Sequence, residues 1–141
     1  MKKYIKYAVA IVLAAGAFGY YYINKPKASL QNKQPDVIIS PQKLLADFTT
    51  DEQQANAKYV DKIIEVSGKV SAKNIDRNKK VSILMDTGDP MSSVTCELNP
   101  AQVEKSSGFD EGSFIEVKGK CTGMLSDIIL VDCVILTNLN N

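Results

Sequence analysis

The residues best suited to chemistry are the three cysteines, Cys96, Cys121 and Cys133. No two of them form a C-x-x-C motif, so the sequence does not support a thioredoxin-like redox pair. The chain contains no histidine, which excludes Ser-His and Cys-His nucleophile systems and histidine-based metal sites. Three thiolates would bind zinc only together with a carboxylate or a ligand from another chain. We therefore predict no catalytic residue, no metal site and no cofactor.

Cys121 and Cys133 lie on either side of a predicted turn, and the residue midway between them is Asp127. In an antiparallel hairpin centred there, the two cysteines are opposite or nearly opposite each other. In an oxidising compartment we predict a disulfide between them, which closes a loop of about 13 residues and contributes about 3 kcal/mol. Two alternatives stay open: a bridge from Cys96 to Cys133 between neighbouring strands, and three reduced cysteines that pack as small apolar residues.

A second candidate site is a basic loop after the first predicted strand, with Lys73, Arg77, Lys79 and Lys80 as candidate ligand-binding residues. From Pro41 onward the chain has 11 basic and 15 acidic side chains, a net charge of −4, and this loop is its concentrated positive charge. The loop is either a binding site or a solvated hairpin tip. The acidic balance weighs against nucleic acid, as does the lack of stacking aromatics on the second and third predicted strands.

The N-terminus has the layout of an export signal or signal anchor, because three lysines precede an uncharged, mostly apolar run from Tyr7 to Ile23. The tripeptide AGA ending at Ala17 offers a cleavage site, but the run stays apolar beyond it. We therefore expect residues 1–23 to be a retained single-pass anchor, with cleavage after Ala17 and a buried N-terminal helix as alternatives. An anchor or a signal places the domain outside the cytoplasm, on the periplasmic side of the inner membrane in a Gram-negative cell. A cleaved product would be secreted to that compartment.

Residues 24–39 are polar and contain two prolines, as expected of a linker that holds a domain off a membrane. The folded domain is predicted over residues 40–141. It begins with a helix, since Ser40 is a favourable N-cap and Pro41 suits the first helical position.

A second helix is predicted to begin at Thr50, whose spacing to Gln53 fits a capping box. In that register Ala57 and Val60 face the core. Helical periodicity ends near Lys62.

After Lys62 the pattern changes from helical to alternating, which indicates half-buried strands. Gly68 inside the first of them predicts a bulge or sharp bend. A short helix is expected after Asn99, which is a possible cap. The strands are predicted over residues 63–72, 81–85, 92–99, 113–123 and 127–136.

Three strands, a short helix and two strands is the order of an OB-fold, a partly open five-stranded barrel. The segments DEQQANAKYVDKIIEVSGKV, VTCEL, GSFIEVKGKCTG and DIILVDCVIL resemble the tRNA-anticodon-like OB-fold family, whose small domains often follow a signal or anchor in bacteria. The resemblance covers roughly residues 42 to 136. It implies a mainly β (α+β) fold, with a five-stranded barrel preceded by N-terminal helices, and it implies no particular activity.

For function, the sequence favours a non-enzymatic, membrane-tethered interaction module that binds a protein or another envelope component. A single-stranded nucleic-acid binder that uses the basic loop is the alternative. A third reading is an enzyme or redox protein that acts through a cysteine. The sequence predicts no oligomeric state.

Overall fold

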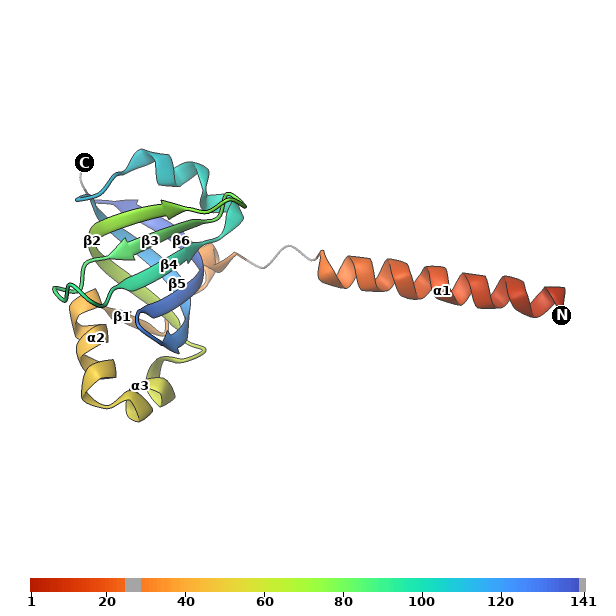
Figure 1. The fold of residues 1–141 in the computed structure, drawn as a ribbon, viewed down its shortest axis with the longest axis horizontal. Helices are drawn as coiled ribbons and strands as arrows, with labels where there is room; N and C mark the ends of the chain where they lie inside the picture. The colour runs from red at the N-terminus through yellow and green to blue at the C-terminus, as the bar shows by residue number, and fades with distance from the viewer. Residues whose placement is uncertain (25–28, 140–141) are drawn as a thin grey trace.

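Five strands close into a barrel in the computed structural model, which describes residues 1–24 and 29–139 (Figure 1). Neighbouring strands pair in the order β2-β3-β4-β6-β5, and β2 also pairs with β5 to close the ring. Within the barrel, β4 and β6 are parallel and the other pairs are antiparallel. This is the predicted OB-fold, which is confirmed. The strands are β2 (Ile63–Ile75), β3 (Val81–Met85), β4 (Val94–Leu98), β5 (Phe114–Met124) and β6 (Ile128–Asn138).

The barrel interior is formed by the alternate apolar residues of the strands. On β4, for example, Val94, Cys96 and Leu98 are buried, as the alternation predicts. Of the bulge or sharp bend predicted at Gly68, the bulge is wrong, because the irregularity in β2 lies between Val70 and Ala72. A Cβ on Gly68 would lie 2.7 Å from Cγ of Pro41, so the glycine allows the first residue of a helix to approach the strand.

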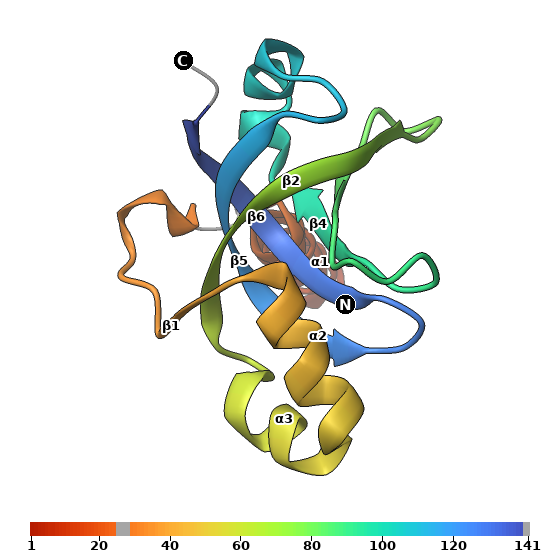
Figure 2. The same ribbon diagram turned by 90° about the vertical axis from the view of Figure 1, so that its left-hand side faces the viewer.

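Two helices, α2 (Pro41–Thr50) and α3 (Glu52–Tyr59), lie together at one end of the barrel (Figure 2). Ser40 caps α2 as predicted, and its Oγ accepts a hydrogen bond of 3.2 Å from the backbone N–H of Lys43. The cap of α3 is Asp51 and not the predicted Thr50. Asp51 Oδ1 accepts a 3.0 Å hydrogen bond from the N–H of Gln54.

The buried face of α3 also differs from the predicted one. Ala55 and Tyr59 are buried, whereas Ala57, which was expected to face the core, is exposed. Thr and Asp are both favourable N-caps, so the local sequence did not distinguish the two start positions.

Part of the segment predicted as a linker packs on the barrel. A short 3-10 turn, η1 (Leu30–Asn32), buries Leu30, and β1 (Val37–Ile39) pairs in parallel with residues 64–66 of β2. The ordered domain therefore begins before residue 40, and residues 25–28 of the predicted linker lie outside the described residues.

The helix predicted after Asn99 is two short 3-10 turns, η2 (Pro100–Gln102) and η3 (Glu104–Gly108). Asn99 is the cap, since its Oδ1 accepts a hydrogen bond of 3.0 Å from the N–H of Ala101.

The N-terminal helix α1 (Lys2–Ile23) has 22 residues, none of them buried, and it extends away from the barrel (Figure 1). At about 1.5 Å per residue it is roughly 33 Å long. Its length and composition suit a membrane span, and an N-terminal signal sequence has the same properties.

Candidate binding face of the barrel

The outward side chains of β3, β4 and β6 form one continuous surface, which we call the outer face. The strand register places Leu84 opposite Thr95, and Thr95 beside Ile129. One step along the strands, Ser82 lies opposite Glu97. The centre of the outer face is thus half-buried and partly apolar, with a hollow at each end.

The first hollow has a volume of about 420 Å³ and lies beside the loop that joins β3 to β4. Of the described residues, three carboxylates, Asp86, Asp89 and Asp127, line it, and no basic side chain among these residues does. Each carboxylate accepts a backbone hydrogen bond within the loops, such as the 2.7 Å bond from the N–H of Ser93 to Asp127 Oδ1. Asp127 thereby ties the β5–β6 turn to the end of the β3–β4 loop.

The second hollow has a volume of about 400 Å³ and lies at the other end of the outer face, at the base of the β2–β3 turn. It is lined by three carboxylates, Asp76, Glu97 and Asp132, and by one amine, that of Lys80. Asp132 has a positive φ of 53°, which is uncommon for a residue with a side chain. Both ends of the outer face are therefore predominantly acidic.

The four predicted ligand-binding residues do not form one site. Lys73 is engaged inside the fold, because its Nζ donates to the carbonyl oxygens of Ser106 at 2.9 Å and Phe109 at 3.0 Å. Lys80 lines the second hollow, and Arg77 and Lys79 are exposed in the turn beyond it.

The predicted disulfide between Cys121 and Cys133 is not confirmed, since all three cysteines are free and buried in this structure. Cys121 pairs with Leu130, and Cys133 lies so close to Gly119 that a Cβ there would be 2.4 Å from the Cys133 Sγ. Register shifts within the β5–β6 pair displace the two cysteines from each other.

The thiol of Cys133 is buried beside that of Cys96. Burial, and then contact with the thiol of Cys96, raise the pKa of Cys133 well above its usual value. A protonated, enclosed thiol is a poor nucleophile.

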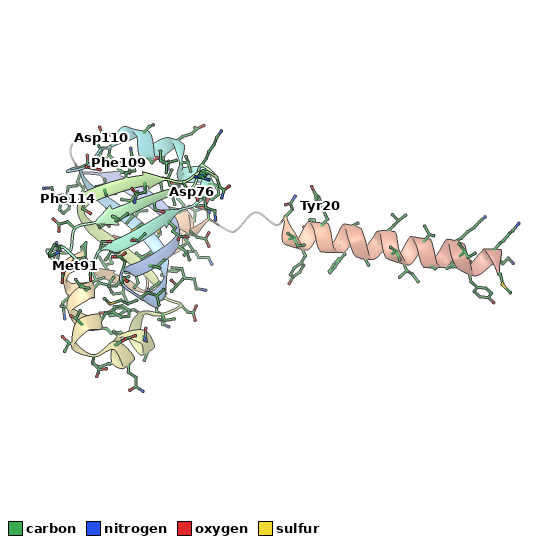
Figure 3. All side chains as sticks on the ribbon, viewed as in Figure 1. Tyr20, Asp76, Met91, Phe109, Asp110 and Phe114 are labelled. Atoms are coloured by element: carbon green, nitrogen blue, oxygen red, sulfur yellow. The ribbon has the colours of Figure 1, made fainter. Side chains whose placement is uncertain are left out.

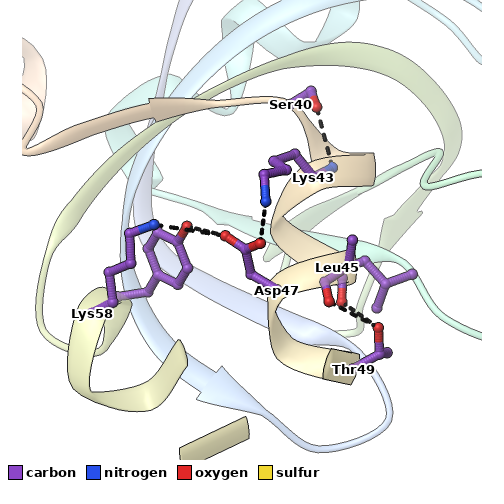
Figure 4. A network of polar contacts seen from close by, with 8 residues as sticks. Ser40, Lys43, Leu45, Asp47, Thr49 and Lys58 are labelled. Carbon is purple, nitrogen blue, oxygen red and sulfur yellow. Dashed lines mark hydrogen bonds and ion pairs between the residues drawn. The ribbon is translucent and has the colours of Figure 1, made fainter. Parts of the chain in front are cut away.

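A polar network that the sequence analysis missed joins α2 to α3 (Figure 4). Tyr59 donates a 2.5 Å hydrogen bond to Asp47 Oδ2, and Lys43 donates to Asp47 Oδ1. The hydrogen bond from Lys43, followed by that from Tyr59, lowers the pKa of Asp47. The spacing of Lys43 and Asp47, four residues apart on a helix, was the available signal. Because its charges satisfy one another, we interpret this network as structural.

Within residues 1–24 and 29–139, no group of three or more histidine, cysteine or acidic residues is placed to hold a metal ion.

The tRNA_anti-like family model matches residues 1–135. A Klebsiella pneumoniae lipoprotein proposed to bind nucleic acid is 14% identical, with a TM-score of 0.55 over 71% of this chain and 92% of that chain. A proposed aspartyl-tRNA synthetase from Leishmania major is also 14% identical, over 89% of this chain and 26% of that one, with a TM-score of 0.46. No curated protein matched. At these identities, the Klebsiella structure supports the fold alone.

Proposed function

The chain belongs to the tRNA_anti-like family, and from that premise we propose that it is a non-enzymatic binding module, anchored in a membrane by α1 with its barrel outside the cytoplasm. A roughly 33 Å helix matches the thickness of a hydrocarbon core of about 30 Å. Lys2, Lys3 and Lys6 precede the apolar run, as in a signal anchor.

The observation that carries the binding proposal is the shape and composition of the outer face. Strands β3 and β4 with their flanking loops correspond to the surface that OB-folds use for ligands. Here that surface has two hollows of about 420 and 400 Å³ with half-buried apolar side chains between them, among them Leu84 and Ile129. Concave sites with an apolar base and a few polar groups at the rim are typical of binding sites.

The charge of the outer face favours a protein partner with basic side chains. Among the described residues, six carboxylates line the two hollows, and one amine, that of Lys80, does so. A phosphate backbone would meet like charge along this surface, whereas lysine or arginine side chains would meet complementary charge.

Site-specific photo-crosslinking of the full chain in its native membrane tests this proposal. A photoreactive amino acid at Thr95, in the centre of the outer face, should give a discrete protein adduct. The same group at Lys69, an exposed β2 residue that does not line either hollow, is the matched control. Glu97→Lys should reduce the Thr95 adduct, because it reverses a charge of the second hollow. Equal adducts at both positions, or none at Thr95, would reject the outer face as the binding face.

A second candidate function, binding of single-stranded nucleic acid, is favoured by the exposed cations Arg77 and Lys79 beside the OB-fold surface. It requires oligonucleotide binding that weakens steeply with salt and is lost in Lys79→Glu/Lys80→Glu. The absence of binding at low salt would end this reading.

A further inference from the structure

The turn between β2 and β3 presents its cations outward, and we call residues 75–80 the basic tip. The Asp76 carboxylate is used within the turn, where its Oδ1 accepts hydrogen bonds from the N–H groups of Asn78 at 2.7 Å and Lys80 at 2.9 Å. In the part of the chain that the structure describes, Arg77, Lys79 and Lys80 take part in no ion pair. The tip therefore exposes three cations, of which Lys80 also borders the second hollow and its carboxylates.

An apolar side chain lies among these cations. Ile75 precedes the turn and is 65% exposed, although its strand partner Val81 is buried in the core. Basic residues around an exposed aliphatic side chain suit the interface of a lipid bilayer, where apolar groups enter the acyl boundary and cations remain among the headgroups.

The covalent chain limits how far the barrel can lie from the end of α1. Four residues lie between Asn24 and Ser29, so their Cα atoms are five steps apart and no more than about 18 Å from each other, at about 3.6 Å per step. Immediately after Ser29, the chain is fixed to the barrel, since Leu30 is buried and Lys118 Nζ donates to the carbonyl oxygen of Gln31 at 3.2 Å. The side of the barrel that carries η1 is thus held close to the membrane end of α1.

The basic tip lies at the same end of the barrel along the direction of α1, although Figure 2 shows the β2–β3 turn and residues 29–36 on opposite flanks of that end. Figure 1 shows the β2–β3 turn and residues 29–36 at the side that faces α1. In Figure 3, Asp76 lies on that side, whereas Met91 and Phe114 lie on the opposite side. The strand register is consistent with this placement. Asp132 of β6 lines the second hollow together with Lys80. Val134, two residues further along β6, pairs with Lys118, whose Nζ donates to the carbonyl oxygen of Gln31 in η1.

We propose that the basic tip binds the headgroups of anionic phospholipids in the membrane that α1 anchors. The inference rests on the anchorage included in the proposed function. Each basic residue near an anionic surface strengthens binding about fivefold, and the effect falls off within a Debye length. This contact turns Met91 and the first hollow away from the bilayer, so that this end of the acidic outer face is presented to a partner.

The proposal predicts a lipid-dependent position of the tip. The full chain carries an environment-sensitive dye on the thiol of Asn78→Cys, which is exposed in the turn, whereas the three native cysteines are buried. It is reconstituted in phosphatidylcholine vesicles with or without phosphatidylglycerol, together with a lipid that bears a quencher on its headgroup. Quenching should increase when phosphatidylglycerol is present and should return toward the phosphatidylcholine value in high salt.

Two pairs of variants that remove the same charge distinguish binding at the basic tip from general attraction of the chain to an anionic membrane. Lys79→Gln/Lys80→Gln should lower the ratio of lipid-bound to free tip about 25-fold, as two residues at about fivefold each. Lys62→Gln/Lys69→Gln, which removes the same charge from exposed residues outside the turn, should leave the quenching unchanged.

The first measurement is whether the chain stays with the vesicles after an alkaline wash, which tests the anchorage by α1. Loss of the chain rejects the anchorage, and with it this inference. Retention with equal quenching in both lipids, or with equal effects of the two variant pairs, rejects the lipid contact alone. If an oligonucleotide removes the quenching in phosphatidylglycerol vesicles and binds the tip without lipid, the cations serve nucleic acid and the proposal fails.

Discussion

The β5–β6 and β2–β3 hairpins belong to the same barrel, but their residues are used differently. In β5–β6 the strands are so close that Gly119 faces the Cys133 sulfur, and the turn is tied down through Asp127. In β2–β3 the strands end in a turn whose cations extend into solvent. The difference teaches that two hairpins of one barrel can serve packing in one case and a surface function in the other. Substitutions should therefore affect stability in β5–β6 and membrane contact at the basic tip.

The largest loss of stability is expected from Gly119→Ala. The added Cβ would lie 2.4 Å from Cys133 Sγ, 3.1 Å from Leu130 Cβ and 3.3 Å from the Val131 carbonyl oxygen. Two of these atoms cannot rotate away, so we expect the free energy of unfolding to fall by about 3 kcal/mol in urea titrations of the solubilised chain.

Gly108→Ala is the matched control, because its Cβ would meet no atom within 4 Å, and we expect a change below about 0.5 kcal/mol. Adding Cys133→Ala to Gly119→Ala should recover part of the loss. Equal stability of Gly119→Ala and the wild type would mean that the two strands do not approach as closely as described.

Lys73 extends the comparison within β2 itself, since this lysine belongs to the predicted basic group but is engaged in packing. Lys73→Met removes the donor to the carbonyl oxygens of Ser106 and Phe109 while keeping the aliphatic stem. We expect a loss of about 2 kcal/mol, because charged donors to buried acceptors contribute more than neutral ones. Lys80→Met should leave the free energy of unfolding in urea almost unchanged. If Lys73→Met and Lys80→Met lowered it by similar amounts, the distinction between a packed Lys73 and a solvent-exposed Lys80 would be wrong.

Alkaline pH should weaken the packed hairpin through Cys133. Burial and contact with Cys96 raise the pKa of the Cys133 thiol in the folded state, so the unfolded chain loses this proton first. The stabilising contribution is complete below the unfolded pKa of about 8.5 and decreases above it by about 1.4 kcal/mol per pH unit. Unfolding measured against pH should show this slope, and Cys133→Ala should have a shallower one. A native Cys133 that reacts with maleimide as fast as the thiol of Asn78→Cys would refute its enclosure.

The sequence predicted the strands because alternation reports burial directly, as in Val94, Cys96 and Leu98. It did not predict which cysteines approach each other, because register shifts in β5–β6 depend on how the barrel closes. The basic group was recognised by composition, but composition does not distinguish Lys73, which reaches η3, from Lys79, which remains in solvent. Strand β1 was missed because a three-residue strand surrounded by polar residues gives too short a pattern.

The smallest effect on folding is expected at the basic tip, where the comparison is sharpest. Lys79→Gln/Lys80→Gln removes two exposed charges without a described ion pair and preserves the backbone bonds of the turn to Asp76. Solvated side chains of this kind contribute little to folding, so the free energy of unfolding should change by less than about 0.5 kcal/mol. The same variant should lower the ratio of lipid-bound to free tip about 25-fold, since the two lysines act on the membrane and not on the fold. A stability loss as large as that of Lys73→Met would show instead that the tip is part of the packing, and the contrast between the two hairpins would not hold.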